Sequence, residues 1–270
     1  MRPTGLLYSA VLQAYAKSAS PEGAALAEEL LERTKEQYKQ GKLYSKPTTL
    51  FYNAVMDAHA RSNGGREAAL RAEELLQELE SRGRAGDSSL KPKTRSFNAA
   101  ILAWKNSQAD DAPERAEALL KQMNDRYRAG DSDCRPDSVT LNSIIAVWAN
   151  SGKEQAAERA EEFLQFMEEV YKESGDASLK PDAWTFNTAI SAYAKSRRPD
   201  RMQRARQLYD RMKHLYETTG DADLRPDAIT FTLLKTIWAK SKDGAATPGS
   251  IAAIGREIAR FQGSTVKARK

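Results

Sequence analysis

Residues 180–196 read KPDAWTFNTAISAYAKS, and this stretch decides the fold. Pro181 fixes a turn and Asp182 is a good N-cap, so the stretch predicts a helix that begins here. One face of this helix is apolar at spacings of four and three residues: Phe186, Ile190 and Tyr193. A second face carries an aromatic, an amide, a hydroxyl and a cation: Trp184, Asn187, Ser191 and Lys195. A helix that only packs needs the first face, so the second face is a candidate binding surface.

Related stretches recur along the whole chain. The prolines that open them stand 44 or 45 residues apart: Pro3, Pro47, Pro92, Pro136, Pro181 and Pro226. Six residues before each of the last five prolines stands a glycine: Gly41, Gly86, Gly130, Gly175 and Gly220. A period this regular is the signature of a repeat array. We therefore number six repeats, one from each proline.

Each repeat is predicted to hold two antiparallel helices. The first helices are expected at residues 4–18, 48–62, 93–107, 137–151, 182–196 and 227–241. The second helices are expected at residues 21–40, 65–82, 113–129, 153–174, 199–218 and, as a short degenerate cap, 249–262. A fixed alanine in the second helices allows close helix packing: Ala27, Ala72, Ala116, Ala160 and Ala205. The prediction is an all-α fold, a right-handed α-solenoid of five hairpins and a partial sixth over residues 1–262. A basic tail, 263–270, is expected to be disordered.

Composition favours some partners and excludes others. The formal charge of +5 favours an acidic partner, and no apolar run approaches the roughly 18 residues of a membrane span. Cys134 is the only cysteine, and we expect it to be a small buried hydrophobe. The chain has no targeting segment and reaches a repeat proline by Pro3, which leaves open that it is a fragment of a longer protein with a further domain.

Catalytic and metal motifs are absent from the sequence. Neither His59 nor His214 has a cysteine or carboxylate at metal-ligand spacing. No phosphate-binding Gly-rich loop and no GxSxG occurs. The Gly-Asp pairs, such as Gly175-Asp176, are better explained as helix-ending turns than as calcium ligands. We predict no catalysis, no cofactor and no metal.

The second face of each first helix forms a row of four positions, which we call the row. A large side chain opens each row: Leu6, Leu50, Arg95, Val139, Trp184 and Ile229. An amide or hydroxyl follows in every repeat: Ser9, Asn53, Asn98, Asn142, Asn187 and Thr232. A cation closes four rows, and Lys105 stands one residue from the end of another: Lys17, Arg61, Lys195 and Lys240.

This pattern is what single-stranded nucleic acid needs. Apolar or planar groups wedge against bases, amides and hydroxyls reach base edges, and lysines meet phosphates. Each residue also has a simpler structural explanation. An Asn in a first turn can bond nearby backbone, and a lysine near a helix C-terminus interacts with the helix dipole. Recurrence over six repeats favours binding.

The run PDAWTFNTAISAYAKS at 181–196 resembles the first helix of the pentatricopeptide repeat, PDxxTYNxLIxAxxKxG. PDSVTLNSIIAVWANSG at 136–152 and PDAITFTLLKTIWAKS at 226–241 match that pattern too. In the second helices, RAEELL and RAEALL resemble the family's A-x-x-L-x-x-x-M pattern. The resemblance covers about residues 3–245. Tetratricopeptide repeats are the alternative, but their Trp–Leu-Gly–Tyr signature is absent.

The resemblance implies sequence-selective binding of single-stranded RNA, about one base per repeat, by a monomer. Two residues of the family read each base, one in the row and one after the next repeat's proline. The corresponding pairs here are Ser9 with Thr48, Asn53 with Lys93, Asn98 with Asp137, Asn142 with Asp182, and Asn187 with Asp227, while Thr232 has no partner. Asn with Asp is the family's uridine-preferring pair, so a U-rich stretch is expected. Family members act mainly in mitochondria and plastids, in RNA processing, stability or translation.

The length of the repeat departs from the family. Its repeat has about 35 residues, whereas this one has 44 or 45, with a longer second helix and Gly-Asp turn. The three aspartates, Asp137, Asp182 and Asp227, also have a complete explanation as N-caps.

The competing function is a protein-interaction scaffold whose concave surface holds a peptide or a helix, and protein partners stay open. Charge distinguishes the two functions, because an RNA groove should be positive along the first helices, with acids kept on the second helices. The negative charge of Asp57 on a first helix argues against RNA binding. The cations that support it are Lys17, Arg61, Lys105, Lys195 and Lys240.

Overall fold

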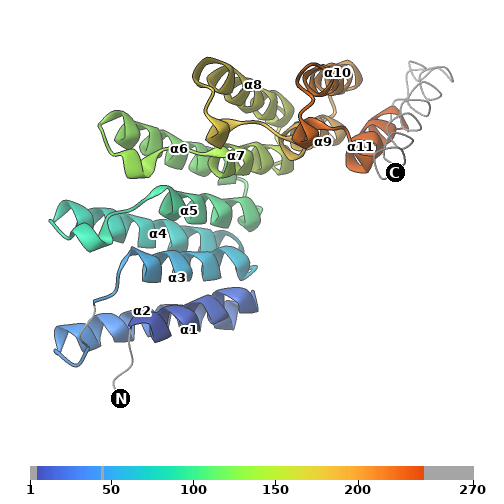
Figure 1. Ribbon diagram of the computed structural model, residues 1–270. Helices are drawn as coiled ribbons and strands as arrows, with labels where there is room; N and C mark the ends of the chain where they lie inside the picture. The colour runs from blue at the N-terminus through green and yellow to red at the C-terminus, as the bar shows by residue number, and fades with distance from the viewer. Residues whose placement is uncertain (1–4, 44–45, 240–270) are drawn as a thin grey trace, which may run out of the picture. The chain divides into compact units, whose positions relative to one another are not determined.

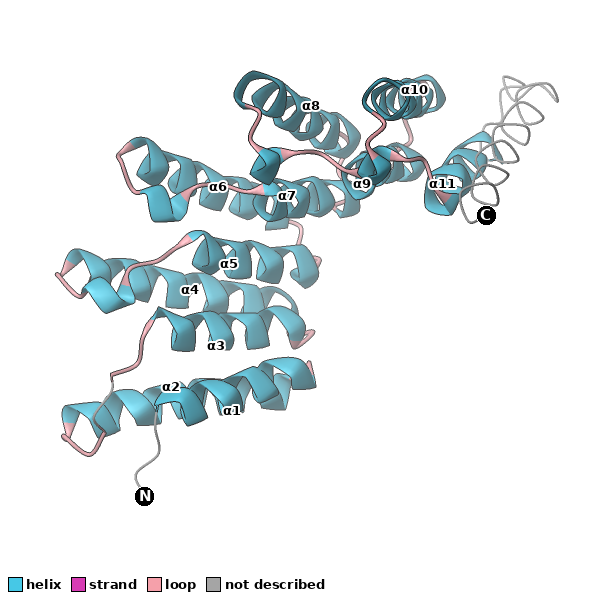
Figure 2. Ribbon diagram, in the orientation of Figure 1, coloured by secondary structure: helices cyan, strands magenta, loops and turns pink. Residues whose placement is uncertain are grey.

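The computed structural model describes residues 5–43 and 46–239 of the chain. Within these ranges every regular element is helical, and no strand occurs (Figure 2). The chain forms two compact units, residues 1–147 and 148–270, and the boundary between them falls inside a helix. Each unit is therefore described by itself.

First and second helices alternate in the predicted order (Figure 1). The first helices are α1 (Gly5–Ser18), α3 (Thr49–Arg61), α5 (Thr94–Ser107), α7 (Ser138–Asn150), α9 (Ala183–Lys195) and α11 (Ala228–Ala239). The second helices are α2 (Pro21–Lys39), α4 (Gly65–Arg84), α6 (Ala112–Arg128), α8 (Ala156–Ser174) and α10 (Arg201–Thr219). The all-α helical-repeat prediction is confirmed. The predicted helix 249–262 and the tail 263–270 lie outside the described residues.

In the first unit, α1, α3 and α5 pack side by side, and α3 also contacts α2 and α4 (Figure 1). The apolar stripes face inward. Leu12, Val55 and Ile101 are fully buried, and the rings of Tyr8 and Phe51 lie 6.5 Å apart. Ala27, Ala72 and Ala116 have no exposed surface, as the close helix approach requires. The hydrophobic faces predicted from sequence are thus the ones that pack.

In the second unit, α9 contacts α8, α10 and α11. Its predicted apolar face is fully buried: Phe186, Ile190 and Tyr193. The fixed alanines and the methionines seven residues after them are also fully buried: Ala160, Ala205, Met167 and Met212. The same pattern therefore builds the core of both units.

Helix starts follow from local hydrogen bonds. At α9 the backbone N–H of Thr185 donates to Asp182 Oδ1 at 2.8 Å, while the Thr185 hydroxyl accepts from the Asp182 backbone at 3.2 Å. This reciprocal capping box satisfies donors that a helix start leaves free. Asp227 and Thr230 make the same pair of bonds at α11. The predicted N-caps are confirmed.

Helix ends show the predicted glycine conformation. Gly175 is the C-cap of α8 with φ of 65°, and Gly130 follows the C-cap of α6 with φ of 95°. This left-handed region favours glycine because other residues carry a Cβ that clashes there. The turn prediction is confirmed for both.

A short 3₁₀ helix follows each of four glycine turns, and the sequence did not predict it: η1 (Ser88–Leu90), η2 (Ser132–Cys134), η3 (Ala177–Leu179) and η4 (Ala222–Leu224). Asp87 begins η1, where its Oδ1 accepts from the Ser89 backbone at 3.1 Å and from Lys46 Nζ at 2.6 Å. Equivalent ion pairs join Lys91 to Asp131 and Lys180 to Asp221. At η1, η2 and η4, the residues that lengthen this repeat thus connect the turn to the preceding one.

Cys134 closes η2 as a buried residue, as predicted. Burial raises the pKa of its thiol to about 11, and Sγ donates to the Pro92 carbonyl at 3.4 Å. A protonated, enclosed thiol packs as a small hydrophobe rather than reacting as a nucleophile.

Candidate nucleic-acid interface

Large side chains open the rows on the surface of the protein. Leu50, Val139 and Ile229 are between 57% and 63% exposed, and Trp184 is 48% exposed. The Arg95 side chain is 66% exposed. The side chain of Leu6 lies outside the described residues. Each described row therefore begins with a large group that the core does not use.

Two predicted base-reading pairs are hydrogen-bonded, one in each unit. Asn98 Nδ2 donates to Asp137 Oδ1 at 3.1 Å in the first unit. Asn187 Nδ2 donates to Asp227 Oδ1 at 3.2 Å in the second. The members of each pair are 39 and 40 residues apart, so the repeat period brings them together.

Capping and pairing use the same carboxylate oxygen. Asp227 Oδ1 accepts from the Thr230 backbone at 2.9 Å as well as from Asn187. Asp137 Oδ1 does the same with Thr140 and Asn98. Within the described chain no donor bonds Oδ2 of either aspartate. The N-cap therefore leaves one acceptor oxygen on each residue.

Other predicted pairs look different. Asn53 and Asn187 are both buried, and Oδ1 of each has no partner, but Asn53 makes no bond to Lys93. The Lys93 ammonium instead pairs with Asp133 at 3.1 Å. The Thr232 hydroxyl donates back along its helix to the Ala228 carbonyl at 2.7 Å. The structure thus does not bring Asn53 and Lys93 together.

The remaining predicted readers are placed on the expected elements. Ser9 on α1 and Asn142 on α7 are half-buried. Thr48 is the half-buried N-cap of α3, with no side-chain capping bond, and Asp182 caps α9. All four residues therefore lie on the elements that the rows predict.

The row cations lie at the C-terminal ends of the first helices. Lys17 and Arg61 are exposed. Burial and the positive charge of Arg61 lower the pKa of Lys105. Lys195 Nζ donates to Asn150 Oδ1 at 2.6 Å, and burial lowers its pKa. Lys240 lies outside the described residues.

A groove of about 290 Å³ runs over the first helices of the first unit. Its lining includes predicted site residues from three repeats: Ser9, Lys17, Leu50, Arg61 and Arg95. In the second unit, a groove of about 800 Å³ lies where α7 and α9 end, lined by Lys153, Lys195, Arg197 and Arg198 among others. Both grooves coincide with the cationic ends of rows.

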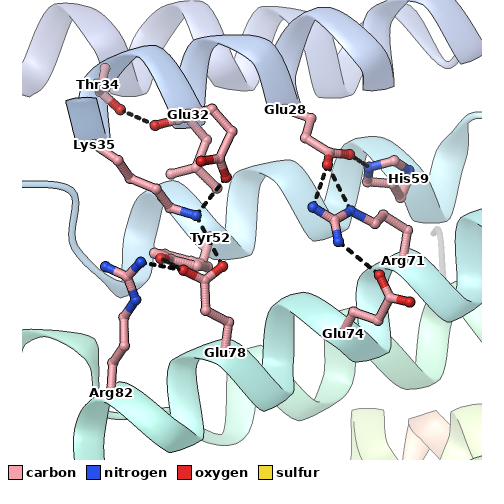
Figure 3. Close-up of polar contacts among 11 residues, drawn as sticks. Glu28, Glu32, Thr34, Lys35, Tyr52, His59, Arg71, Glu74, Glu78 and Arg82 are labelled. Atoms are coloured by element: carbon pink, nitrogen blue, oxygen red, sulfur yellow. Dashed lines mark hydrogen bonds and ion pairs between the residues drawn. The ribbon is translucent and has the colours of Figure 1, made fainter. Parts of the chain in front are cut away.

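Acidic side chains of the second helices form hydrogen bonds and ion pairs with residues of the neighbouring repeat (Figure 3). Glu78 on α4 accepts from Lys35 on α2 at 2.9 Å and from the Tyr52 hydroxyl at 2.8 Å. Glu28 on α2 bonds the His59 ring at 3.0 Å and also pairs with Arg71. These carboxylates are neutralised locally, which keeps them from opposing an anion on the first helices.

Each first helix carries an aromatic residue or His59 at the position that Tyr193 holds in α9, and sequence reasoning did not predict the contacts of this core position. Its polar tip bonds a glutamate of the preceding second helix: His59 with Glu28, Trp104 with Glu73, and Tyr193 with Glu161. In each case that glutamate directly follows the fixed alanine, which is the signal that could have revealed it. Burial lowers the pKa of His59, so this histidine favours its neutral form. The position is structural.

No cluster of metal-ligating side chains occurs in residues 5–43 and 46–239. In the same ranges no helix has the length and hydropathy to cross a bilayer.

Residues 184–215 match the family model of the PPR repeat. The matched segment covers α9 from Trp184, with its row, and most of α10. PPR repeats are characteristic of a family of RNA-binding proteins. No curated protein sequence matches the chain. The other described hairpins have the same order of helices, and successive first helices begin 44 or 45 residues apart.

Proposed function

We propose that this protein binds single-stranded RNA along its rows, selects sequence at about one base per repeat, and has no catalytic activity of its own. The observation that carries the proposal is the bonded pair of Asn187 and Asp227, 3.2 Å apart, next to exposed Trp184 inside the PPR hairpin. Asn98 and Asp137 repeat the pair in the first unit.

The pair can select uridine by its hydrogen-bonding groups. An asparagine amide has two N–H donors, and Asp227 takes one, which leaves a donor for a base carbonyl. Oδ2 of the aspartate is left as an acceptor. Uracil presents one N–H donor flanked by two carbonyl acceptors, so it complements a neighbouring donor and acceptor. Trp184 would stack on the base, and stacking tolerates any base.

Cations at the row ends would hold the phosphates. Lys195→Ala should weaken binding to every RNA alike and reduce the salt dependence, because phosphate contacts release counterions without reading sequence. Lys121→Ala is the matched control, since Lys121 is an exposed lysine of a second helix. It should change affinity much less.

The test is binding to oligouridine, oligoadenosine and duplex RNA at near-physiological salt. The proposal expects tightest binding to oligouridine. Equal weak binding to all three, lost uniformly as salt is added, would indicate a merely basic surface and favour a scaffold for a peptide or helix.

By resemblance we also propose that the protein works as a monomer in a mitochondrion or plastid, in RNA processing, stability or translation. Fluorescent tagging of the protein in its native cells tests this, and a signal confined to the cytosol or nucleus would contradict it.

A further inference from the structure

The second repeat lacks the Asn–Asp pair of the third and fifth repeats. Asn53 makes no bond to Lys93, and the Lys93 ammonium pairs with Asp133 instead. One helical turn after Asn53, however, Asp57 reaches the groove over the first helices. A carboxylate here opposes general RNA binding, so its position needs a specific explanation.

Among the described residues, only one carboxylate oxygen of Asp57 accepts a hydrogen bond. Arg95 Nη2, from the next repeat, donates to Asp57 Oδ2 at 3.1 Å. Among the described residues, Oδ1 of Asp57 has no donor. The Asp57 side chain is 22% exposed, so the carboxylate is oriented yet accessible from the groove. An ionised carboxylate has about four lone-pair sites, and Arg95 uses one of them.

The groove suits one nucleobase of an anionic polymer. Its volume of about 290 Å³ is near the lower end of small-molecule pockets, about 300–1,000 Å³. It is lined by three cations and one carboxylate: Lys17, Arg61, Arg95 and Asp57. Leu50 and Arg95 open their rows at its edge, and a guanidinium plane can stack on a base.

Base chemistry decides which base fits. On its Watson–Crick edge, guanine alone presents two adjacent N–H donors, from N1 and the N2 amino group. Uracil, cytosine and adenine each place an acceptor nitrogen or carbonyl beside their donor, which a carboxylate repels. A carboxylate fixed in a groove therefore discriminates for guanine.

We propose that this groove is a guanine-selective site. Asp57 accepts from N1–H and the N2 amino group, and Arg95 fixes the carboxylate and offers its guanidinium plane for stacking. The inference rests on the proposed binding of single-stranded RNA. It assigns selectivity in the second repeat to Asp57 instead of Asn53.

The experiment uses a set of oligouridines that each carry a single guanosine at a different position, and it measures the affinity of the protein for each RNA. One register should bind about 5- to 150-fold more tightly than oligouridine, the range of a good bidentate base contact. Inosine at that register lacks the N2 amino group and should lose part of the gain. Asp57→Asn should abolish both the guanosine gain and the guanosine–inosine difference, because a carboxamide has a single acceptor oxygen.

Two further variants control the interpretation. Glu67→Gln removes the same charge from an exposed site on α4 and should leave the guanosine gain intact. Arg95→Lys keeps the charge but loses the planar group, so the gain should fall. Thermal melting of each variant shows that it folds, and the guanosine–inosine comparison in the parent needs no variant.

The outcomes separate the two proposals. If the parent does not prefer single-stranded RNA, the proposed function fails and this site fails with it. If the parent binds oligouridine but no guanosine register gains affinity, or if Asp57→Asn keeps the gain, the guanine site alone is overturned.

Discussion

At Asp227 a single side chain caps a helix and contacts the row. Its Oδ1 accepts from Thr230 and Asn187, while Oδ2 is left without a bond from the described residues. Because asparagine caps helices about as well as aspartate, Asp227→Asn should keep the melting temperature. It places an N–H donor where an acceptor was, so the uridine preference at one nucleotide should fall. Melting and RNA binding of the same sample measure both effects.

Asp227→Ala provides the comparison for this prediction. It removes the cap as well and should destabilise the fold by about 0.5–2 kcal/mol. An Asp227→Asn variant that keeps the full base preference would mean that Asp227 serves only as a cap.

Trp184 tests the wedging role of the large row residues. It is 48% exposed, so Trp184→Ala should change stability little and weaken RNA binding by about 1–3 kcal/mol, with the same base preference. Phe166 on α8 is 46% exposed and is the matched control, because it is an aromatic residue on a second helix. Equal RNA affinities of both variants would contradict base stacking on the row.

For single residues, the sequence predicted the positions of side chains in the repeat better than their contacts. The period placed Asn98 beside Asp137 because both lie at fixed distances from successive repeat prolines. It could not predict that Asn53 is buried or that Lys93 turns to Asp133. Long side chains choose among several partners, and a linear pattern does not distinguish them.

The second helices depend on close approach at a fixed alanine. Ala116 and Ala160 have no exposed surface, so Ala116→Leu or Ala160→Leu should destabilise the protein by about 1–3 kcal/mol through overpacking. Denaturant melts measure the loss. Ala118→Leu is the control, because Ala118 is an exposed residue of the same helix as Ala116. If the variants at buried alanines melt with the parent, the hairpin packing described above is wrong.

The turns predict a stability loss in acid. The Lys46 hydrogen bond holds the pKa of Asp87 below its ordinary value of 3.8, and Lys180 does the same for Asp221. A depressed carboxylate pKa stabilises the fold above the unfolded-state pKa, and this contribution is lost as pH falls through the folded-state pKa. Asp87→Asn with Asp221→Asn should therefore flatten the decline of stability below pH 3.8.

Asp110→Asn is the matched control for this pair, because Asp110 is an exposed aspartate outside the turns. Its acid profile should follow the parent's. A double turn variant with an unchanged profile would show that the turn ion pairs contribute nothing measurable.

Helix bounds were predictable to within three residues because caps, glycines and long periodic stretches mark them. The 3₁₀ helices were not, since a three-residue element is too short to show a period. Their role in joining successive turns depends on contacts across about 40 residues, such as Lys46 with Asp87.

For the whole molecule, the repeat period predicted a helical array but not its division into two units. The spacing from Pro136 to Pro181 equals that from Pro181 to Pro226, so nothing in the period marks the boundary between residues 147 and 148. The distribution of charge between first and second helices was predicted more successfully. Second-helix acids such as Glu28 and Glu78 are paired between repeats. Four described first helices, α1, α3, α5 and α9, carry a cation in the last turn. The exception, Asp57, is the residue to which we assign guanine selection.

Selection from a random RNA pool tests the central claim most directly. The parent protein is incubated with the pool at near-physiological salt, and the bound fraction is sequenced. Our account predicts an enriched motif with uridines at the nucleotides bound by the third, fourth and fifth repeats. Asn187→Ser should change the preference at only one of these nucleotides. A bound fraction with no positional preference, or the same motif from both proteins, would contradict base reading by the rows.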